Sequence, residues 1–216
     1  MKYVYFLLIA TVAGCASPRD GEPVGAAEGA AGAAERCESC KSGKHHEDDP
    51  AERVSVTPAP GALTIGSARA AHEIVVFTDL DCPYCQKLHG TLGEVAGSDV
   101  RVVVRHNPLP FHGEEARDAA RAAIAATRLG KGDAFLRAWF GSDGPARLET
   151  AAIKAGISPE ELSRVMRTPE VERALEADVA EAKRLGVRGT PTFFVDGRRT
   201  TGARSREAIA AKLAGG

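Results

Sequence analysis

Two cysteines separated by two residues, Cys82-Pro83-Tyr84-Cys85, have the types and spacing that suit covalent chemistry. Thiols three positions apart on a helix lie about one turn from each other, so they can form and break a disulfide. The pair predicts a dithiol redox site, and half of a zinc site or a structural disulfide are the alternatives. No second CxxC or HxxxH pair follows Cys85, which weighs against a zinc site.

The flanking residues predict a strand and a helix that would position this pair. Residues 74–77 form a continuous apolar run, typical of a strand buried on both faces. After the pair, one helical stripe is apolar, formed by Leu88, Leu92 and Val95. Cys82 would then lie at the N-terminus of a helix, where free N–H groups and the helix dipole favour a thiolate, with Pro83 at the first helical position. Cys85, inside the helix, is better suited to resolve a mixed disulfide.

A second informative stretch covers residues 187–197, VRGTPTFFVDG. It predicts a turn bounded by glycine, a strand over Thr192–Val195 and a hairpin turn at Asp196-Gly197. Pro191, at the head of that strand, is either an ordinary strand-start residue or part of a cis peptide.

Together, FTDLDCPYC and GVRGTPTFFVDG resemble the DsbA-like branch of the thioredoxin superfamily, over roughly residues 54–213. The resemblance implies an α/β protein, a thioredoxin fold with an all-helical subdomain inserted between its halves, here at about 112–185. It implies that Cys82 is the exposed nucleophile and Cys85 the resolving thiol, with a redox-active disulfide and no cofactor. The residues it assigns to substrate binding are Thr190, Pro191, Pro83 and Tyr84.

The remaining elements are expected from their patterns. Valine-rich residues 100–105 predict a strand parallel to 74–77, and residues 54–71 an edge strand. The inserted helices are expected over 114–129, 133–140, 148–155, 158–166 and 168–185, and a last helix over 206–213. Gly130 should cap the first of these, and Ser158 and Thr168, each followed by Pro and Glu, should act as N-caps.

The N-terminus predicts export. Met1–Ala13 holds one lysine and then an apolar stretch, in the order of a secretory signal and too short to span a membrane. Its ending, Val12-Ala13-Gly14-Cys15, resembles the lipobox of a bacterial lipoprotein, so residues 1–15 are interpreted as a lipoprotein signal peptide and Cys15 as the acylated residue. Ala16 after the cysteine fits outer-membrane delivery, and a plain signal peptide is the alternative.

Residues 16–53 are rich in Ala, Gly and Glu without apolar periodicity, and predict a flexible tether that precedes a folded domain at 54–216. A second CxxC lies within the tether, close to two histidines. The cluster comprises Cys37, Cys40, His45 and His46. It could form a local disulfide loop, bind zinc or copper, or exchange disulfides with the main pair.

Several charged or titratable residues lie near the main pair in sequence. Asp79 and Asp81 would oppose a thiolate if their carboxylates point at it. Thioredoxins proper carry a buried acid at the position of Val76, which weakens an interpretation as a plain thioredoxin reductant. His89 and His106 are candidates for proton handling, although a surface histidine without a role is the simpler expectation. Two further basic residues, Lys87 and Arg105, are expected to be solvated.

Composition limits the possible functions. The 216 residues carry a formal net charge of −1 and 5% aromatics, so nothing indicates a nucleic-acid partner. Five cysteines favour an oxidising compartment, and with Cys15 lipidated the other four form two pairs. The predicted protein is a periplasm-facing lipoprotein of the bacterial cell envelope, held in the membrane by its N-terminal lipid.

Three functions remain open. The first, slightly favoured, is a thiol oxidase that transfers disulfides to exported proteins and is reoxidised by a membrane partner. The second is a reductase or isomerase, because CPYC with threonine before the cis-proline also resembles glutaredoxin-like and DsbG-like proteins. The third is a metal-binding lipoprotein that uses the tether cluster of cysteines and histidines.

Overall fold

The structure, a computed structural model, describes residues 53–144 and 147–215, and a five-stranded mixed sheet lies at its centre. The strand order is β1-β3-β2-β4-β5. Only β2 and β3 pair in parallel, and the other neighbours are antiparallel. The strands are β1 (Leu63–Ile65), β2 (His72–Thr78), β3 (Val100–His106), β4 (Thr192–Val195) and β5 (Arg198–Thr201).

The central strand β2 is buried on both faces, as its continuous apolar run predicts. Ile74 and Val76 point into the larger hydrophobic core, which also contains Leu88 and Leu92. Side chains of opposite orientation form a second, smaller cluster on the other face of the sheet: Val75, Phe77, Ala182, Leu185 and Phe194. β2 and β3 pair in parallel, as predicted, from His72 opposite Val100 to Thr78 opposite His106. Both strands therefore end at the same edge of the sheet, and the cysteine pair follows shortly after β2.

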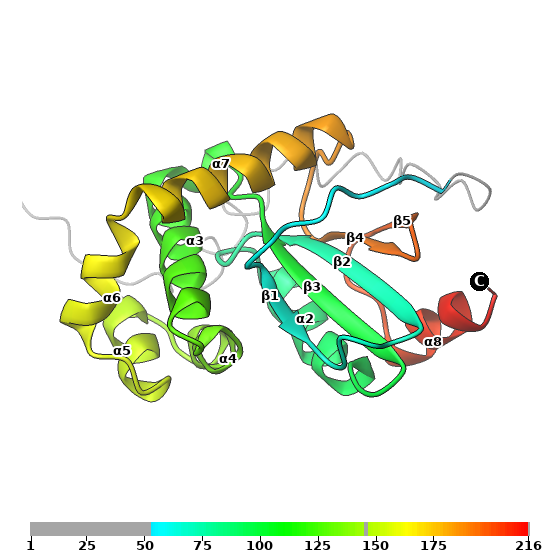
Figure 1. The fold of residues 1–216 in the computed structure, drawn as a ribbon, viewed down its shortest axis with the longest axis horizontal. Helices are drawn as coiled ribbons and strands as arrows, with labels where there is room; N and C mark the ends of the chain where they lie inside the picture. The colour runs from blue at the N-terminus through cyan, green and yellow to red at the C-terminus, as the bar shows by residue number, and fades with distance from the viewer. Residues whose placement is uncertain (1–52, 145–146, 216) are drawn as a thin grey trace, which may run out of the picture. The chain divides into compact units, whose positions relative to one another are not determined.

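Helices account for the rest of the fold (Figure 1). Helix α2 (Pro83–Val95) connects β2 to β3 and packs against α8 (Arg206–Ala214). Between β3 and β4 come a short 3-10 helix, η1 (Pro110–His112), and five α-helices, as the sequence predicts. These are α3 (Gly113–Arg128), α4 (Gly132–Phe140), α5 (Arg147–Lys154), α6 (Pro159–Met166) and α7 (Pro169–Arg184).

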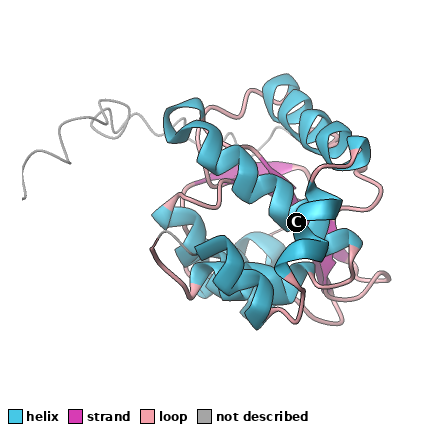
Figure 2. Cartoon of the chain, turned by 90° about the vertical axis from the view of Figure 1, so that its left-hand side faces the viewer, coloured by secondary structure: helices cyan, strands magenta, loops and turns pink. Residues whose placement is uncertain are grey.

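The inserted helices gather at one side of the sheet, and α7 runs from this group back across β3 (Figure 1). Seen from the side of the insertion, helices lie in front of the strands and hide most of the sheet (Figure 2). Eight residues of α3 are buried, and seven of them are alanines. Because alanine side chains are small, this helix can pack closely against its neighbours.

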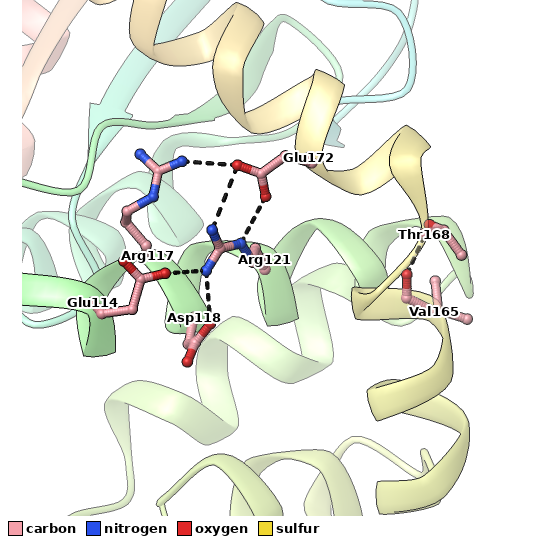
Figure 3. A network of polar contacts seen from close by, with 7 residues as sticks. All are labelled: Glu114, Arg117, Asp118, Arg121, Val165, Thr168 and Glu172. Atoms are coloured by element: carbon pink, nitrogen blue, oxygen red, sulfur yellow. Dashed lines mark hydrogen bonds and ion pairs between the residues drawn. The ribbon is translucent and has the colours of Figure 1, made fainter.

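Charged side chains join the two longest inserted helices (Figure 3). The Arg121 guanidinium on α3 lies 2.7 Å from the carboxylate of Glu172 on α7 and 2.8 Å from that of Asp118. Arg117, one turn earlier on α3, also reaches Glu172, at 2.8 Å. Two guanidinium groups therefore share one carboxylate, which links α3 to α7 along one side.

The two predicted N-caps behave differently. Ser158 accepts a hydrogen bond from the Glu161 N–H at 3.1 Å, as expected. Thr168 precedes α7 but does not cap it with its side chain, so that part of the prediction is wrong. Its hydroxyl donates instead to the Val165 carbonyl at 2.8 Å, because the preceding helix ends only a few residues earlier (Figure 3).

Arg105 is not solvated as predicted, but 3% exposed on β3. Its guanidinium pairs with the buried Asp178 carboxylate of α7 at 2.7 Å and donates to the Thr57 carbonyl at 2.9 Å. The sequence pattern misses this because the partner lies far along the chain, on the helix that covers this face of the sheet. The pair fixes α7 and the segment around Thr57 against β3.

The predicted hairpin turn between β4 and β5 is confirmed. Asp196 has φ 47° and Gly197 φ 82°, the left-handed backbone that an Asp-Gly turn requires. A Cβ at Gly197 would lie 2.6 Å from the Val54 carbonyl oxygen, so only glycine lets the N-terminal segment approach. The Asp196 carboxylate accepts hydrogen bonds from the Glu73 N–H and the His72 ring, which ties the turn to the start of β2.

The predicted signal peptide (1–15) and nearly all of the tether (16–53) lie outside the described residues. So do Cys15, Cys37, Cys40, His45 and His46. Within residues 53–144 and 147–215, no helix is long and apolar enough to cross a membrane.

Candidate functional site

The two cysteines begin helix α2, as predicted. Cys82 is the N-cap residue, with extended φ and ψ of −85° and 120°, and Pro83 occupies the first helical turn. The Cys85 N–H donates to the Cys82 carbonyl at 3.0 Å, which places both side chains on the same turn. Both are free thiols; Cys82 is 6% exposed and Cys85 fully buried. Cys82 is therefore much less exposed than the resemblance implies, although it remains the more accessible of the two.

The two sulfurs differ in acidity. The pKa of Cys82 falls from 9.0 to about 6, chiefly because the Cys85 thiol donates a hydrogen bond to its sulfur, while burial acts in the opposite direction. The pKa of Cys85 is raised, first by burial and then by the same hydrogen bond, which it makes as a neutral thiol. At neutral pH, Cys82 is therefore largely a thiolate and Cys85 a thiol.

The predicted proline loop faces these sulfurs. The peptide bond between Thr190 and Pro191 is cis, and the Cys82 sulfur lies 3.3 Å from the Thr190 carbonyl oxygen, to which its thiol form donates. The Pro191 carbonyl accepts a hydrogen bond from the Gly202 N–H at 2.8 Å, which ties the loop to the end of β5. Two motifs far apart in sequence therefore meet at one sulfur.

The two residues between the cysteines point outward. Pro83 is exposed, and Tyr84 is 54% exposed with its ring centroid 5.8 Å from the Lys87 ammonium. Lys87 is itself exposed, as expected. Phe111 of η1 is also exposed, at 71%. Aromatic surface is therefore available on α2 beside the cysteines and on η1.

A buried carboxylate organises the loop between β2 and α2. Asp79 accepts from the Asp81 N–H at 2.9 Å with one oxygen, and from the Leu109 N–H at 2.7 Å and the His112 ring at 2.8 Å with the other. Its side chain is fully buried. Three N–H donors satisfy the charge, so this carboxylate acts as the anchor of the loop rather than as a group aimed at Cys82.

The next residues of the loop are held by the inserted helices. The Leu80 carbonyl accepts from the indole N–H of Trp139 on α4 at 3.0 Å. The Asp81 carboxylate lies 3.1 Å from the Arg147 guanidinium of α5, which also covers the Trp139 ring at 4.4 Å. Burial raises the pKa of Asp81 and Arg147 opposes that shift, so this second carboxylate is also paired.

Of the two candidate histidines, His106 is buried, contrary to the simpler expectation, and His89 is half-buried. His106 is 3% exposed, and its Nδ1 has no hydrogen-bond partner among the described residues. His89 is half-buried beneath Phe140, with its Nε2 3.3 Å from the Thr78 hydroxyl oxygen. Burial lowers the pKa of both imidazoles to about 4, so both are neutral at pH 7.

Four residues of the site are absent from the sequence-based assignment: Thr78, His112, Trp139 and Arg147. Only one of them carried a usable signal, since Trp139 is the single tryptophan of the chain and buried indoles need a hydrogen-bond acceptor. The others have common residue types, and their partners are set by how the insertion packs on the loop.

Comparison with known proteins shows which family the chain belongs to. Residues 73–214 match the family model of the DSBA-like thioredoxin domain. The chain belongs to the DSBA-like thioredoxin family. A thioredoxin-like oxidoreductase from Silicibacter pomeroyi is 32% identical, with a TM-score of 0.64 over 72% of this chain and 91% of that one. The predicted thioredoxin fold with a helical insertion, and the predicted class of thiol-disulfide oxidoreductase, are both confirmed.

Two further relatives place the domain in context. A periplasmic thioredoxin-like protein from Salmonella enterica serovar Typhimurium is 24% identical, with a TM-score of 0.66 over 76% of this chain and 98% of that one, which shows the shared fold. A Na(+)/H(+) antiporter NhaA from Herminiimonas arsenicoxydans is 32% identical over 154 residues, 68% of this chain. The match covers 24% of that antiporter, so the chain spans about a quarter of such relatives.

DSBA-like enzymes carry out disulfide exchange with a redox-active disulfide rather than a cofactor. In the described part of the chain, no group of three or more His, Cys, Asp or Glu side chains is arranged to hold a metal ion. The tether cluster, predicted above as a possible zinc or copper site, lies outside that part.

The acidity of Cys82 can be tested by following thiolate absorbance at 240 nm against pH in the reduced protein with Cys15, Cys37 and Cys40 replaced by Ser. We expect a transition near pH 6 from Cys82. Cys85→Ala, which removes the main donor, should move the transition upward towards 9, whereas Cys85→Ser, which keeps an O–H donor, should move it less. A transition near pH 6 that persists in Cys82→Ala would contradict the assignment.

The same shift predicts a pH dependence of stability. Because the folded-state pKa of Cys82 lies below its unfolded value, ionisation stabilises the folded, reduced protein. This contribution is complete above about pH 9 and is lost as pH falls through about 6. As the pH is lowered from about 9 to about 6, the melting temperature of the reduced protein should therefore fall relative to that of its Cys82→Ala variant.

Proposed function

We propose that Cys82 is the attacking sulfur of a disulfide-exchange reaction and that Cys85 resolves the resulting intermediate. The observation that carries this proposal is the asymmetry of the pair. Cys82 has the lower pKa and the more accessible position and lies 3.3 Å from the cis-proline loop, whereas Cys85 is a buried thiol. A sulfur that is ionised and reachable reacts first.

The reaction then follows in two steps. The Cys82 thiolate attacks a substrate disulfide, one substrate sulfur leaves as a thiolate, and a mixed disulfide forms. Cys85 loses its proton and attacks the Cys82 sulfur, which forms the Cys82–Cys85 disulfide and releases the second substrate sulfur. Run in reverse, the same steps oxidise two substrate thiols and reduce the protein.

The substrate is proposed to lie against the proline loop. The Thr190 carbonyl oxygen, on the cis bond to Pro191, lies 3.3 Å from the Cys82 sulfur, and an extended segment can pair there with backbone groups as it would along a strand edge. Pro83 and Tyr84 offer exposed apolar surface next to the reacting sulfur. Such a surface suits exported proteins that are still unfolded, since their cysteines lie in extended, partly apolar segments.

The roles of the two cysteines can be separated by trapping. Cys82→Ser should abolish disulfide transfer to a reduced, unfolded test protein. With a test protein that carries a disulfide, Cys85→Ser should still attack through Cys82, release one substrate thiolate and accumulate mixed disulfides, visible as a shifted band on a non-reducing gel. Lys87→Ser, an exposed change on the same helix, serves as the control and should behave as the parent. Trapping by Cys82→Ser rather than by Cys85→Ser would reverse the assignment.

We infer that the protein acts as an oxidase rather than as a reductase. A low Cys82 pKa stabilises the reduced form relative to the disulfide, so the disulfide tends to be passed on. Equilibration with glutathione measures the reduction potential of the Cys82–Cys85 pair. A reduction potential near −120 mV would support an oxidase, whereas one near −270 mV, as in thioredoxin, would indicate a reductant that needs an electron donor.

We also propose that the protein works in the bacterial envelope, anchored through lipid on Cys15 and reoxidised by a membrane partner. The lipobox-like Val12-Ala13-Gly14-Cys15 supports this proposal, as does the similarity to a periplasmic protein of the same fold. The expected outcome is that the full chain fractionates with outer membranes and that Cys15→Ser becomes soluble. A variant that stays with the membrane would rule out this anchor.

A further inference from the structure

The sulfur of Cys85 is closed off from solvent but faces two hydrogen-bond donors at the end of β2. The backbone N–H of Asp79 points at it from 3.5 Å. Thr78, the residue of β2 before Asp79, is fully buried, and a hydrogen bond from its hydroxyl would lower the pKa of Cys85 and so oppose the effect of burial.

These donors matter because Cys85 carries negative charge at one point of every exchange cycle. It is a thiolate when it attacks the mixed disulfide, and it leaves as a thiolate when a substrate attacks the Cys82–Cys85 disulfide. A charge developing at a buried sulfur is costly unless fixed dipoles already point at it. Cys82 is already served by the hydrogen bond that the Cys85 thiol donates to it.

The Thr78 hydroxyl must be oriented to serve as a donor. A hydroxyl has one proton and two lone pairs, and its proton can point at the Cys85 sulfur only if other neighbours do not take it. The Nε2 of His89 on α2 lies 3.3 Å from this hydroxyl oxygen. An N–H at Nε2 would occupy a lone pair of the oxygen and leave the hydroxyl proton for the sulfur.

The surroundings of His89 favour a neutral donor. Its Nε2 lies 3.3 Å from the Thr78 hydroxyl oxygen, and its ring centroid lies 4.9 Å from that of Phe140 on α4. Burial and the neighbouring His106 hold the pKa of His89 at about 4. Across the pH range of disulfide exchange, His89 therefore keeps a single N–H and adds no charge.

We propose that the Thr78 hydroxyl and the Asp79 amide form a donor pair that stabilises the Cys85 thiolate, and that His89, protonated at Nε2, orients the hydroxyl. The proposal rests on the proposed function, since it concerns the step that Cys85 performs. Thr78 is then a further catalytic residue, because it touches the reacting sulfur. His89 is a positioning residue that acts through Thr78.

In the resolving step, the Cys85 thiol loses its proton and its electron pair forms the bond to the Cys82 sulfur. The bond between Cys82 and the substrate sulfur breaks, its electron pair leaves with the substrate, and the proton lost by Cys85 is balanced by the one that the substrate thiolate takes up. No group other than the two cysteines and the substrate is oxidised or reduced. The Thr78 and Asp79 donors keep their protons and stabilise only the developing charge.

A reagent that reports each step separately tests this role. The full chain, reduced and carrying Ser at 15, 37 and 40, is mixed with 5,5′-dithiobis(2-nitrobenzoate). Attack by Cys82 releases a first coloured thiolate, and attack by Cys85 on the mixed disulfide releases a second. Thr78→Val should slow the second phase about 10- to 100-fold, the loss expected for one hydrogen bond to a charged group, and leave the first phase unchanged. Thr78→Ser should restore it.

His89 is tested through its dependence on Thr78. His89→Leu should slow the second phase, and His89→Gln, which keeps an N–H at similar reach, should recover part of the rate. The double variant Thr78→Val/His89→Leu should be no slower than Thr78→Val alone, because the two residues act on one donor. In the parent protein, ¹⁵N chemical shifts of the His89 ring should identify Nε2 as the protonated nitrogen.

The outcomes distinguish a failure of this proposal from a failure of the disulfide-exchange mechanism on which it rests. A parent protein that releases only one coloured thiolate would contradict the exchange mechanism itself. Two normal phases in the parent, with an unchanged second phase in Thr78→Val, would overturn the role of Thr78 alone. An Nδ1-protonated His89 ring, or additive effects in the double variant, would overturn the role of His89. Should Thr78→Val fail to fold, the tautomer measurement and the comparison of Thr78→Ala with Thr78→Ser still decide.

Discussion

The buried Asp79 carboxylate is the interaction on which the site depends. A fully buried charge is tolerated only when donors surround it, and here three N–H groups from the loop and from the segment after β3 do so. In meeting that need, the chain fixes the loop that leads into Cys82 against η1. The same residue turns its backbone N–H towards the Cys85 sulfur. One aspartate thus joins the insertion to both cysteines.

The asymmetry between the two sulfurs follows from their depth in the structure. Cys82 lies at the helix start, with Cys85 as its hydrogen-bond donor, and ionises easily. Cys85 lies one turn deeper, where burial opposes ionisation and only Thr78 and Asp79 offset it. The two sulfurs of one motif therefore differ in acidity because Cys85 is buried more deeply than Cys82.

The inserted helices do more than extend the fold. Trp139 and Arg147 hold the loop residues Leu80 and Asp81, and α7 returns to the sheet through the buried pair of Asp178 with Arg105. The insertion thereby contacts both ends of the segment from β2 to β3. A thioredoxin core alone would leave this loop without those contacts, so the insertion is a structural part of the reactive site.

The sequence by itself determined the local elements and pointed to the two cysteines proposed to react. The strand of residues 74–77, the apolar stripe of α2 and the order of the inserted helices all depend on short-range patterns. The meeting of CPYC with Thr190-Pro191 is expected from the resemblance to the DsbA-like family. Tertiary structure alone decided the burial of His89, His106 and Arg105, the loss of the Thr168 cap and the limited exposure of Cys82. Each of these depends on a partner distant in sequence or on neighbouring helices that cover a side chain. Such long-range contacts produce no periodic pattern in the sequence, so local patterns cannot predict them.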